Sequence, residues 1–229
     1  MSARSGTLEE GQVRAMFDRI AGPYDLMNSV MTAGLHHRWR SRAADLARVG
    51  PGSRALDVAT GTGDLALELA GRGAEVVGSD FSEGMLDVAR RKAPALRWEL
   101  GNALALPYPD DEFDAATVGF GARNFSDLER GLGEMARVVR PGGRVVVLEI
   151  TTPTKPPLST FFSLWFDRIV PLLGKLAAEP EAYTYLPSSV KRFPGPETLG
   201  GILAGVGLRD VRWILTAGGI IALHSGTVA

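Results

Sequence analysis

A short turn with two glycines, flanked by two acids, has the clearest capacity for chemistry in this sequence. Asp57 precedes the turn Gly61-Thr62-Gly63, and Asp64 follows it. The glycines let a ligand approach bare backbone, and the free N–H groups where a helix begins can bind an anionic group. The spacing of the glycines also fits the dinucleotide-binding fingerprint. The turn by itself therefore indicates only a nucleotide-like ligand.

The two acids help to decide which ligand fits. A pyrophosphate bound in the turn would face Asp57 and Asp64, and the Coulomb energy between like charges is unfavourable. A ligand with an ammonium, a sulfonium and a single carboxylate tolerates the same turn, and S-adenosylmethionine is such a ligand. The simpler alternative is an ordinary connection between a strand and a helix, with a capping aspartate.

Polar side chains recur at the ends of other predicted strands. Apolar runs predict five successive strands, at residues 55–58, 74–79, 96–100, 113–120 and 144–150. Asp80 follows the second strand and can accept hydrogen bonds from both hydroxyls of a ribose. Asn102 follows the third strand and can offer its amide to an adenine edge. For Asp80, the alternative is an exposed acid in a loop.

The alternation of strands and helices predicts an α/β fold with a doubly wound, largely parallel sheet. Ligands of such sheets bind at the carboxyl ends of the strands. We therefore expect 57–64, Asp80, Asn102 and 119–124 to converge on one site. Two last strands, at 211–215 and 220–224, predict a closing antiparallel hairpin.

Two segments lie outside this sheet pattern. Residues 1–50 predict an N-terminal helical lid over the site, with a helical pair packed on the core as the alternative. Residues 51–229 form the main domain, with an apolar insertion at about 153–195. The insertion predicts a helix that lines an apolar pocket or touches a bilayer surface, or else a core helix, and then a polar loop at 183–192. It carries four large aromatic side chains: Phe161, Phe162, Trp165 and Phe166.

The composition argues against several classes of function. The 229 residues carry a net charge of −1, which does not favour nucleic acid, and we expect no nucleic-acid partner. The absence of cysteine excludes disulfides, thiolate metal sites and cysteine nucleophiles, and we expect no metal. The N-terminus lacks the apolar core of a signal peptide, and no apolar run reaches the roughly 18 residues of a spanning helix. These features predict a cytoplasmic protein.

Two motifs make the sequence resemble a known family. The first is Tyr24-Asp25-Leu26-Met27-Asn28, followed by His36 and Trp39; the second is Arg137-Val138-Val139-Arg140-Pro141-Gly142-Gly143. The chain resembles the class I S-adenosylmethionine-dependent methyltransferases, and more closely the ubiquinone/menaquinone biosynthesis C-methyltransferase family, from about residue 13 to 224. That resemblance implies a seven-stranded sheet whose last strand runs antiparallel. Gly119 departs from the family, in which some members have a serine there.

The resemblance implies S-adenosylmethionine as methyl donor and a polyprenylated quinol as acceptor. The expected reaction is C-methylation of a demethylmenaquinol to menaquinol, in menaquinone biosynthesis. By the resemblance, four residues contact the methyl donor: Thr62, Asp80, Asn102 and Ala103. The turn and the strand ends add four more expected contacts: Asp57, Gly61, Gly63 and Gly119.

Catalysis would require a phenol of the acceptor to lose its proton next to the reacting carbon. Arg123 is expected to stabilise the phenolate, and Asn124 to hydrogen-bond the ring oxygen. Further candidates for proton handling are Tyr24, Asp25, His36 and Tyr185. For His36, a structural role is the alternative.

Other functions stay open at this point. The acceptor could be a polyprenyl benzoquinol of ubiquinone biosynthesis, or another small molecule. A nicotinamide-binding oxidoreductase and an inactive cofactor-binding subunit are alternatives from other classes, and Asp57 and Asp64 argue against the first of them. The insoluble tail of the acceptor leads us to expect peripheral contact with the inner face of the membrane. The oligomeric state stays open, with a homodimer among the options.

Overall fold

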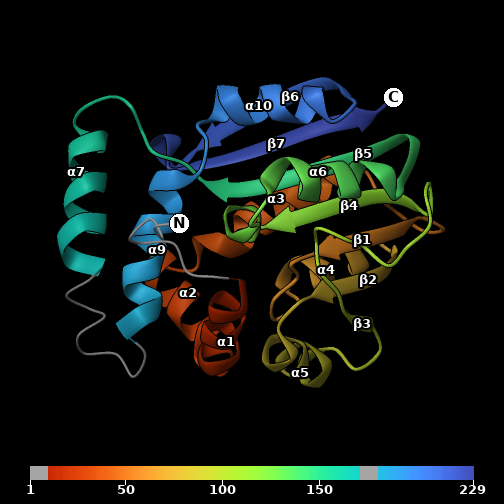
Figure 1. Ribbon diagram of the computed structural model, residues 1–229, viewed down its shortest axis with the longest axis horizontal. Coiled ribbons are helices and arrows are strands. Elements are labelled where there is room, and N and C mark those ends of the chain that lie inside the picture. Colours follow the sequence, from red (N-terminus) through yellow and green to blue (C-terminus); the bar gives the residue numbers. More distant parts are fainter. Residues whose placement is uncertain (1–9, 171–179) are drawn as a thin grey trace, which may run out of the picture.

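A seven-stranded sheet runs through the computed structural model, which describes residues 10–170 and 180–229 (Figure 1). The strands in spatial order are β3 (Arg97–Leu100), β2 (Glu75–Asp80), β1 (Arg54–Val58), β4 (Phe113–Gly119), β5 (Val139–Ile150), β7 (Ile221–Val228) and β6 (Leu208–Thr216). The first five are parallel, and β7 runs antiparallel between β5 and β6. The predicted doubly wound sheet with a closing antiparallel hairpin is therefore confirmed.

Helices cover both faces of the sheet and one of its ends. They are α1 (Glu10–Ile20), α2 (Tyr24–Thr32), α3 (Leu35–Ala47), α4 (Asp64–Ala70), α5 (Glu83–Lys92), η1 (Ala122–Asn124), α6 (Leu128–Arg137), α7 (Leu158–Leu164), η2 (Trp165–Ile169), α9 (Pro180–Arg192), α10 (Pro196–Gly205) and η3 (Ala217–Gly219). Two of them begin at side chains that cap free backbone amides. Ser82 Oγ accepts from the Met85 N–H, and the Asp127 carboxylate accepts from the Arg130 N–H.

Strand β5 shows why the strands could be read from the sequence. Val145 and Val147 point to a core that includes residues of α6 and α10, while Val146 and Leu148 point to a core that includes residues of α3 and α4. Successive side chains of a strand alternate between faces, and here both faces are buried. The strand therefore reads as a continuous apolar run.

Two elements differ from the sequence prediction. Strand β5 begins at Val139 rather than Arg144, because Val139 already pairs with Phe113 before an irregularity in the ladder. Residues 183–192, predicted as a polar loop, belong to helix α9. The hydroxyls of Ser188 and Ser189 each donate to a carbonyl three residues earlier, so these polar side chains are satisfied within the helix.

The described part of the N-terminal segment forms α1, α2 and α3, near the end of the sheet to which β4 and β5 point (Figure 1). Helix α3 packs on the sheet through Ala43, Ala44 and Ala47, which are all buried. Helix α1 packs on α5, with Met16 and Met85 in one cluster. Whether the segment opens as a lid stays a prediction.

The apolar insertion divides its aromatic side chains between core and surface. Phe162 and Phe166 are buried and stack on each other beside Val190 of α9. Phe161 and Leu164 are 56% and 50% exposed. Residues 171–179 of the insertion lie outside the described residues. The four aromatics therefore do not line one groove together.

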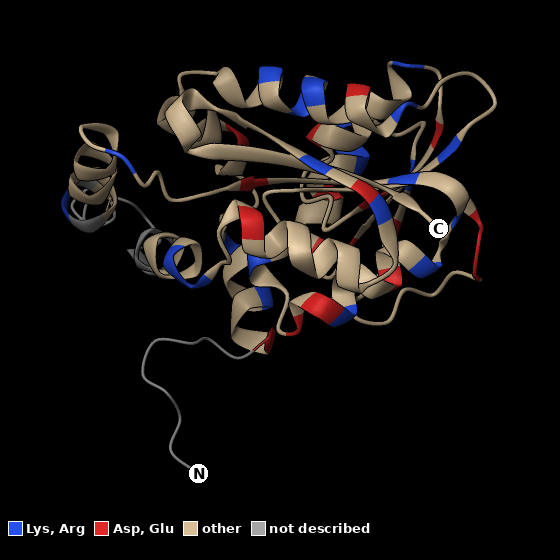
Figure 2. Ribbon diagram, turned by 90° about the horizontal axis from the view of Figure 1, so that it is seen from above, with Lys and Arg blue, Asp and Glu red and all other residues tan. Residues whose placement is uncertain are grey.

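Two further observations concern the distribution of charged residues and the length of the helices. Figure 2 shows acidic and basic residues interspersed around the ribbon. Over residues 10–170 and 180–229, no helix is both long enough and apolar enough to cross a bilayer. The expectation that nucleic acid is not a partner stays a prediction.

The glycine turn yields a test of packing. Gly63 has a φ of +86°, and a Cβ there would lie 2.4 Å from the Trp98 ring; Gly61 has a φ of +56° with no atom within 4 Å. Gly63→Ala should therefore lower the free energy of unfolding by about 2–4 kcal/mol, because strain adds to a clash. The matched variant Gly61→Ala has only the strain and should lose about 1 kcal/mol. Urea denaturation measures both; equal losses would show that the Trp98 contact is unimportant.

Candidate active site

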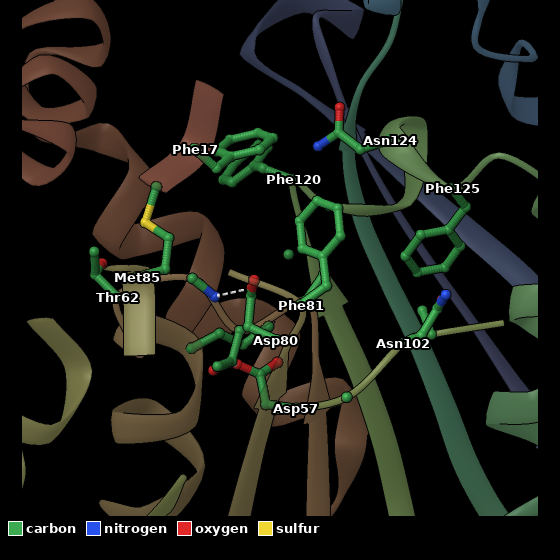
Figure 3. A pocket seen from close by; sticks show the side chains of 18 of the residues that line it. Phe17, Asp57, Thr62, Asp80, Phe81, Met85, Asn102, Phe120, Asn124 and Phe125 are labelled. Atoms are coloured by element: carbon green, nitrogen blue, oxygen red, sulfur yellow. Dashed lines mark hydrogen bonds between the residues drawn. The ribbon is translucent and has the colours of Figure 1, made fainter. Parts of the chain in front are cut away.

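The carboxylate of Asp80 joins the turn after β1 to the end of β2. Its Oδ2 accepts from the Gly61 N–H at 2.7 Å (Figure 3), and its Oδ1 accepts from the Ser82 N–H at 2.9 Å. The Thr60 N–H also donates to the Ser79 carbonyl at 3.0 Å. A carboxylate oxygen can accept more than one hydrogen bond, so each keeps capacity for a ligand.

Asp57 lies beside this unit, at the end of β1. Its two oxygens accept from the hydroxyls of Thr60 and Thr117, each at 2.6 Å. Burial raises the pKa of Asp57 and that of Asp80 to about 6, against hydrogen bonds that act in the opposite direction. Both side chains are buried, yet above pH 6 both are mostly ionised. Their charges favour a ligand with hydroxyl donors or a positive charge.

A cavity of about 850 Å³, partly open to solvent, lies over these strand ends (Figure 3). It is lined by nine of the residues singled out in the sequence: Tyr24, Asp57, Gly61, Thr62, Asp80, Asn102, Ala103, Gly119 and Asn124. The ends of parallel strands bring together the eight residues from Asp57 to Asn124, and Tyr24 comes from helix α2.

Five other residues predicted for the site do not line the cavity: Asp25, His36, Gly63, Arg123 and Tyr185. Gly63 instead allows the close approach of the Trp98 ring. Two lining residues, Ala59 and Phe120, are non-glycine residues with φ of +50° and +61°. Such strain is tolerated where the surrounding structure imposes it, and it concentrates at functional sites.

Sequence reasoning missed several lining residues: Glu10, Phe17, Arg40, Phe81, Met85 and Phe125. Phe81 directly follows Asp80, so its place at a strand end was a signal that could have identified it. Arg40 lies in a helix outside the sheet pattern, and nothing in its spacing indicated the cavity. The large apolar side chains supply surface for a flat, apolar part of a ligand.

The N-terminal helices are bonded to the rim of the cavity. The Thr62 hydroxyl donates to the Asp25 carboxylate of α2 at 2.5 Å. Lys92 pairs with the same carboxylate at 2.6 Å and with Asp64 at 2.8 Å. On the other side, the Asn102 amide donates to Glu10 of α1 at 2.8 Å. Asp25, a candidate for proton handling, is thus held by two partners.

Arg123 and Asn124 have different surroundings. Arg123 Nη1 donates to Glu149 at 2.7 Å and to the Phe120 carbonyl at 2.5 Å, and both charged side chains are buried. Burial opposes the charge of Arg123 most strongly, but the charge and hydrogen bond of Glu149, together with Tyr24 and Tyr185, outweigh it, so the pKa of Arg123 is raised. Asn124 lines the cavity and accepts from the Tyr185 hydroxyl at 3.1 Å.

His36 is buried behind the cavity wall. Its Nδ1 contacts the Arg40 guanidinium, and its Nε2 lies 3.1 Å from Ser29 Oγ. Burial, and then Arg40, lower the pKa of His36 to about 4, so the ring is neutral at pH 7. This setting fits the structural alternative for His36. His36, His37 and Asp64 also place ligand-type atoms within 4.8 Å of one another, but Arg40 and Lys92 already face Asp64. The expectation of no metal stays a prediction.

The residues present fit S-adenosylmethionine. Asp80 retains acceptor capacity for the ribose hydroxyls, while Asn102 and Phe81 offer an amide and an aromatic face for the adenine. Asp57 adds negative charge for a cationic ligand. The side chains that line the cavity therefore fit the ligand that was inferred from the sequence.

The raised pKa of Asp57 predicts a pH-dependent gain of stability on its removal. The folded-state pKa of Asp57, about 6, lies above the usual aspartate value of 3.8, so ionisation costs stability as pH rises through this window. Asp57→Asn should raise the free energy of unfolding of the ligand-free protein by about 1–3 kcal/mol at pH 7.5. The gain should shrink toward pH 4.5. Denaturant titrations at both pH values measure it, and a gain that does not change with pH would contradict the assignment.

Solved structures share this fold. A structure from Thermotoga maritima, described as a SAM-dependent methyltransferase, aligns with a TM-score of 0.68 at 19% identity, covering 94% of this chain and 99% of that one. At that identity the likeness shows the fold alone.

Sequence similarity is much higher. A protein of Thermus thermophilus named demethylmenaquinone methyltransferase is 50% identical over 92% of this chain and 99% of its own length. A protein of Geobacter sulfurreducens named ubiquinone/menaquinone biosynthesis C-methyltransferase UbiE is 42% identical, over 95% and 89%. Residues 5–228 match the family itself. The chain belongs to the ubiE/COQ5 methyltransferase family.

Proposed function

We propose that this methyltransferase transfers the methyl group of S-adenosylmethionine to a ring carbon of a demethylmenaquinol. The observation that carries the proposal is the similarity, along nearly its whole length, to the Thermus relative named for that reaction. The geometry adds support. A polar group on the cavity wall, Asn124, adjoins the hydroxyl of Tyr185 and the buried cation of Arg123.

The reaction transfers a carbon between two partners. S-adenosylmethionine supplies an electrophilic methyl group on a sulfonium, and the ring carbon of the quinol attacks it in line. A C–C bond forms, the S–CH₃ bond breaks with its electron pair left on sulfur, and one ring proton is lost. The products are the menaquinol, S-adenosylhomocysteine and a proton. The protein must hold the reacting atoms about 3–3.5 Å apart before the step.

Arg123 would act by its charge rather than as a base. Its guanidinium keeps its proton because Glu149 lies 2.7 Å from it. A fixed cation favours the anionic form of a nearby phenol, and a preorganised charge needs no rearrangement during the reaction. Asn124 and Tyr185 would hydrogen-bond the ring oxygens. Tyr24, which also lines the cavity, is a further candidate for proton transfer.

A double variant tests this role. Arg123→Ala alone would leave Glu149 buried and unpaired, which itself destabilises proteins by about 3–5 kcal/mol. Arg123→Met/Glu149→Gln removes both charges together. We expect turnover of reduced demethylmenaquinol to fall roughly 100-fold, as when one transition-state donor is lost. Binding of S-adenosylhomocysteine should stay near wild type by calorimetry.

The same assay tests the function. Wild-type protein should methylate the quinol and not the oxidised quinone, which has no phenol to ionise. Failure to methylate any quinol would overturn the proposed function. A matching rate on a demethyl benzoquinol would favour the wider acceptor range that the name of the Geobacter relative indicates. A fall in S-adenosylhomocysteine affinity in step with turnover would instead assign Arg123 to the donor site or the fold.

We further propose that the prenyl tail, and the membrane surface that holds it, contact apolar side chains on α2 and α7. Leu26 and Val30 of α2 are 68% and 73% exposed, and Phe161 and Leu164 of α7 are about half exposed. The net charge of −1 makes this contact mainly hydrophobic and reversible. The protein would then work in the cytoplasm, at the inner face of the membrane.

Surface variants test the tail contact. Phe161→Ser/Leu164→Ser should reduce activity on a long-tailed quinol at least about fivefold, since burying each apolar side chain contributes about 1.5–3 kcal/mol. Activity on a tailless analogue should be unchanged. Leu215→Ser on strand β6, where the side chain is 51% exposed, is the matched control and should affect neither acceptor. An equal loss of activity on both acceptors would contradict the proposed tail contact.

A further inference from the structure

Arg40 is a buried cation in an otherwise acidic cavity. Among the described residues that line the cavity, it is the one lysine or arginine, whereas Glu10, Asp57, Asp64 and Asp80 are acids. It comes from helix α3 and is 5% exposed. Its guanidinium carbon lies 5.3 Å from the centre of the Phe120 ring. Burial of an arginine is costly unless its charge and its N–H groups are matched.

The partners of Arg40 within the protein do not satisfy it. Its Nη1 lies 3.5 Å from Asp64 Oδ2, an ion pair without a hydrogen bond, and that oxygen has no hydrogen-bond partner among the described residues. Asp64 is already bonded to Lys92 through its other oxygen at 2.8 Å. In the described part of the chain, the hydrogen bond of Arg40 is the one to His36. A guanidinium has five N–H donors, so most remain for a ligand.

His36 fixes the direction of the guanidinium. As a neutral ring it accepts from Arg40 at Nδ1, which places its own proton on Nε2, 3.1 Å from Ser29 Oγ. The Phe120 ring and His36 thus both contact the planar group. His36 is a positioning residue in this arrangement.

The methyl donor carries one anionic group, the carboxylate of its amino-acid end. A carboxylate is the group that a guanidinium binds best, through two parallel hydrogen bonds. We propose that Arg40 binds the amino-acid carboxylate of S-adenosylmethionine and of S-adenosylhomocysteine. Asp57 and Asp64, which lie near Arg40, offer partners of opposite charge to the ammonium group of the methyl donor. This inference concerns the donor alone and does not depend on which quinol is the acceptor.

Two ligands that differ by one group test the proposal. S-adenosylhomocysteine has the carboxylate, and S-adenosyl-3-thiopropylamine lacks only that group. Calorimetry with wild-type protein should give roughly 10- to 100-fold weaker binding without the carboxylate, the range for charge-assisted hydrogen bonds. Arg40→Met should bind S-adenosylhomocysteine weaker by a similar factor. It should then bind both ligands within about threefold of each other.

Control variants keep the outcome decisive. Lys92→Met removes the other cation bonded to Asp64, outside the cavity, and should keep the wild-type ratio between the two ligands. Arg40→Lys keeps the positive charge but cannot form two parallel hydrogen bonds, so it should keep part of the affinity ratio between the two ligands. This variant also keeps the test possible if Arg40→Met does not fold. If every Arg40 variant weakens both ligands by the same factor, Arg40 serves the fold and the proposal is wrong.

Discussion

The carboxylate of Asp80 is the constraint on which the active site depends. It accepts one amide from the turn after β1 and one from the loop after β2, so two separate strand ends form one rigid unit. The turn contains Gly61 and Gly63 in left-handed conformations, which other residues adopt only with strain. Because these bonds are internal to the protein, the turn has its shape before a ligand arrives, and binding need not order it.

The charged residues in and around the cavity fall into two groups with different consequences. Arg123 pairs with Glu149, and Lys92 pairs with Asp25 and Asp64, so these charges are compensated within the protein. The direct hydrogen-bond partners of Asp57 and Asp80 in the described chain are neutral hydroxyls and amides. Their raised pKa values show that burial outweighs these hydrogen bonds and, for Asp57, the nearby charge of Arg40. Such groups cost stability in the free protein and are offset when a ligand supplies donors or positive charge.

Different elements around the sheet contribute residues to the sites of the two reacting molecules. Helices α1, α2 and α3 reach the rim of the cavity through Glu10, Asp25 and Arg40; Asp25 lies at the glycine turn and Glu10 at Asn102. Helices α7 and α9 come from the insertion after β5, and α9 brings the Tyr185 hydroxyl to Asn124. The helices that flank the strand ends differ between proteins of one fold, and specificity for an acceptor arises in such additions.

The sequence by itself determined the strands, the glycine turn and the convergence of Asp57, Asp80 and Asn102. Strands buried on both faces read as apolar runs, and parallel strands end at one edge, so their terminal residues must meet. Only the tertiary structure decided which side chains are paired. Arg40 reaches the cavity from a helix outside the sheet pattern, and Arg123 finds Glu149 on a neighbouring strand. It also separated buried Phe162 from exposed Phe161. Contacts between elements depend on how helices pack and turn against the sheet, and periodicity within one segment carries no information about that.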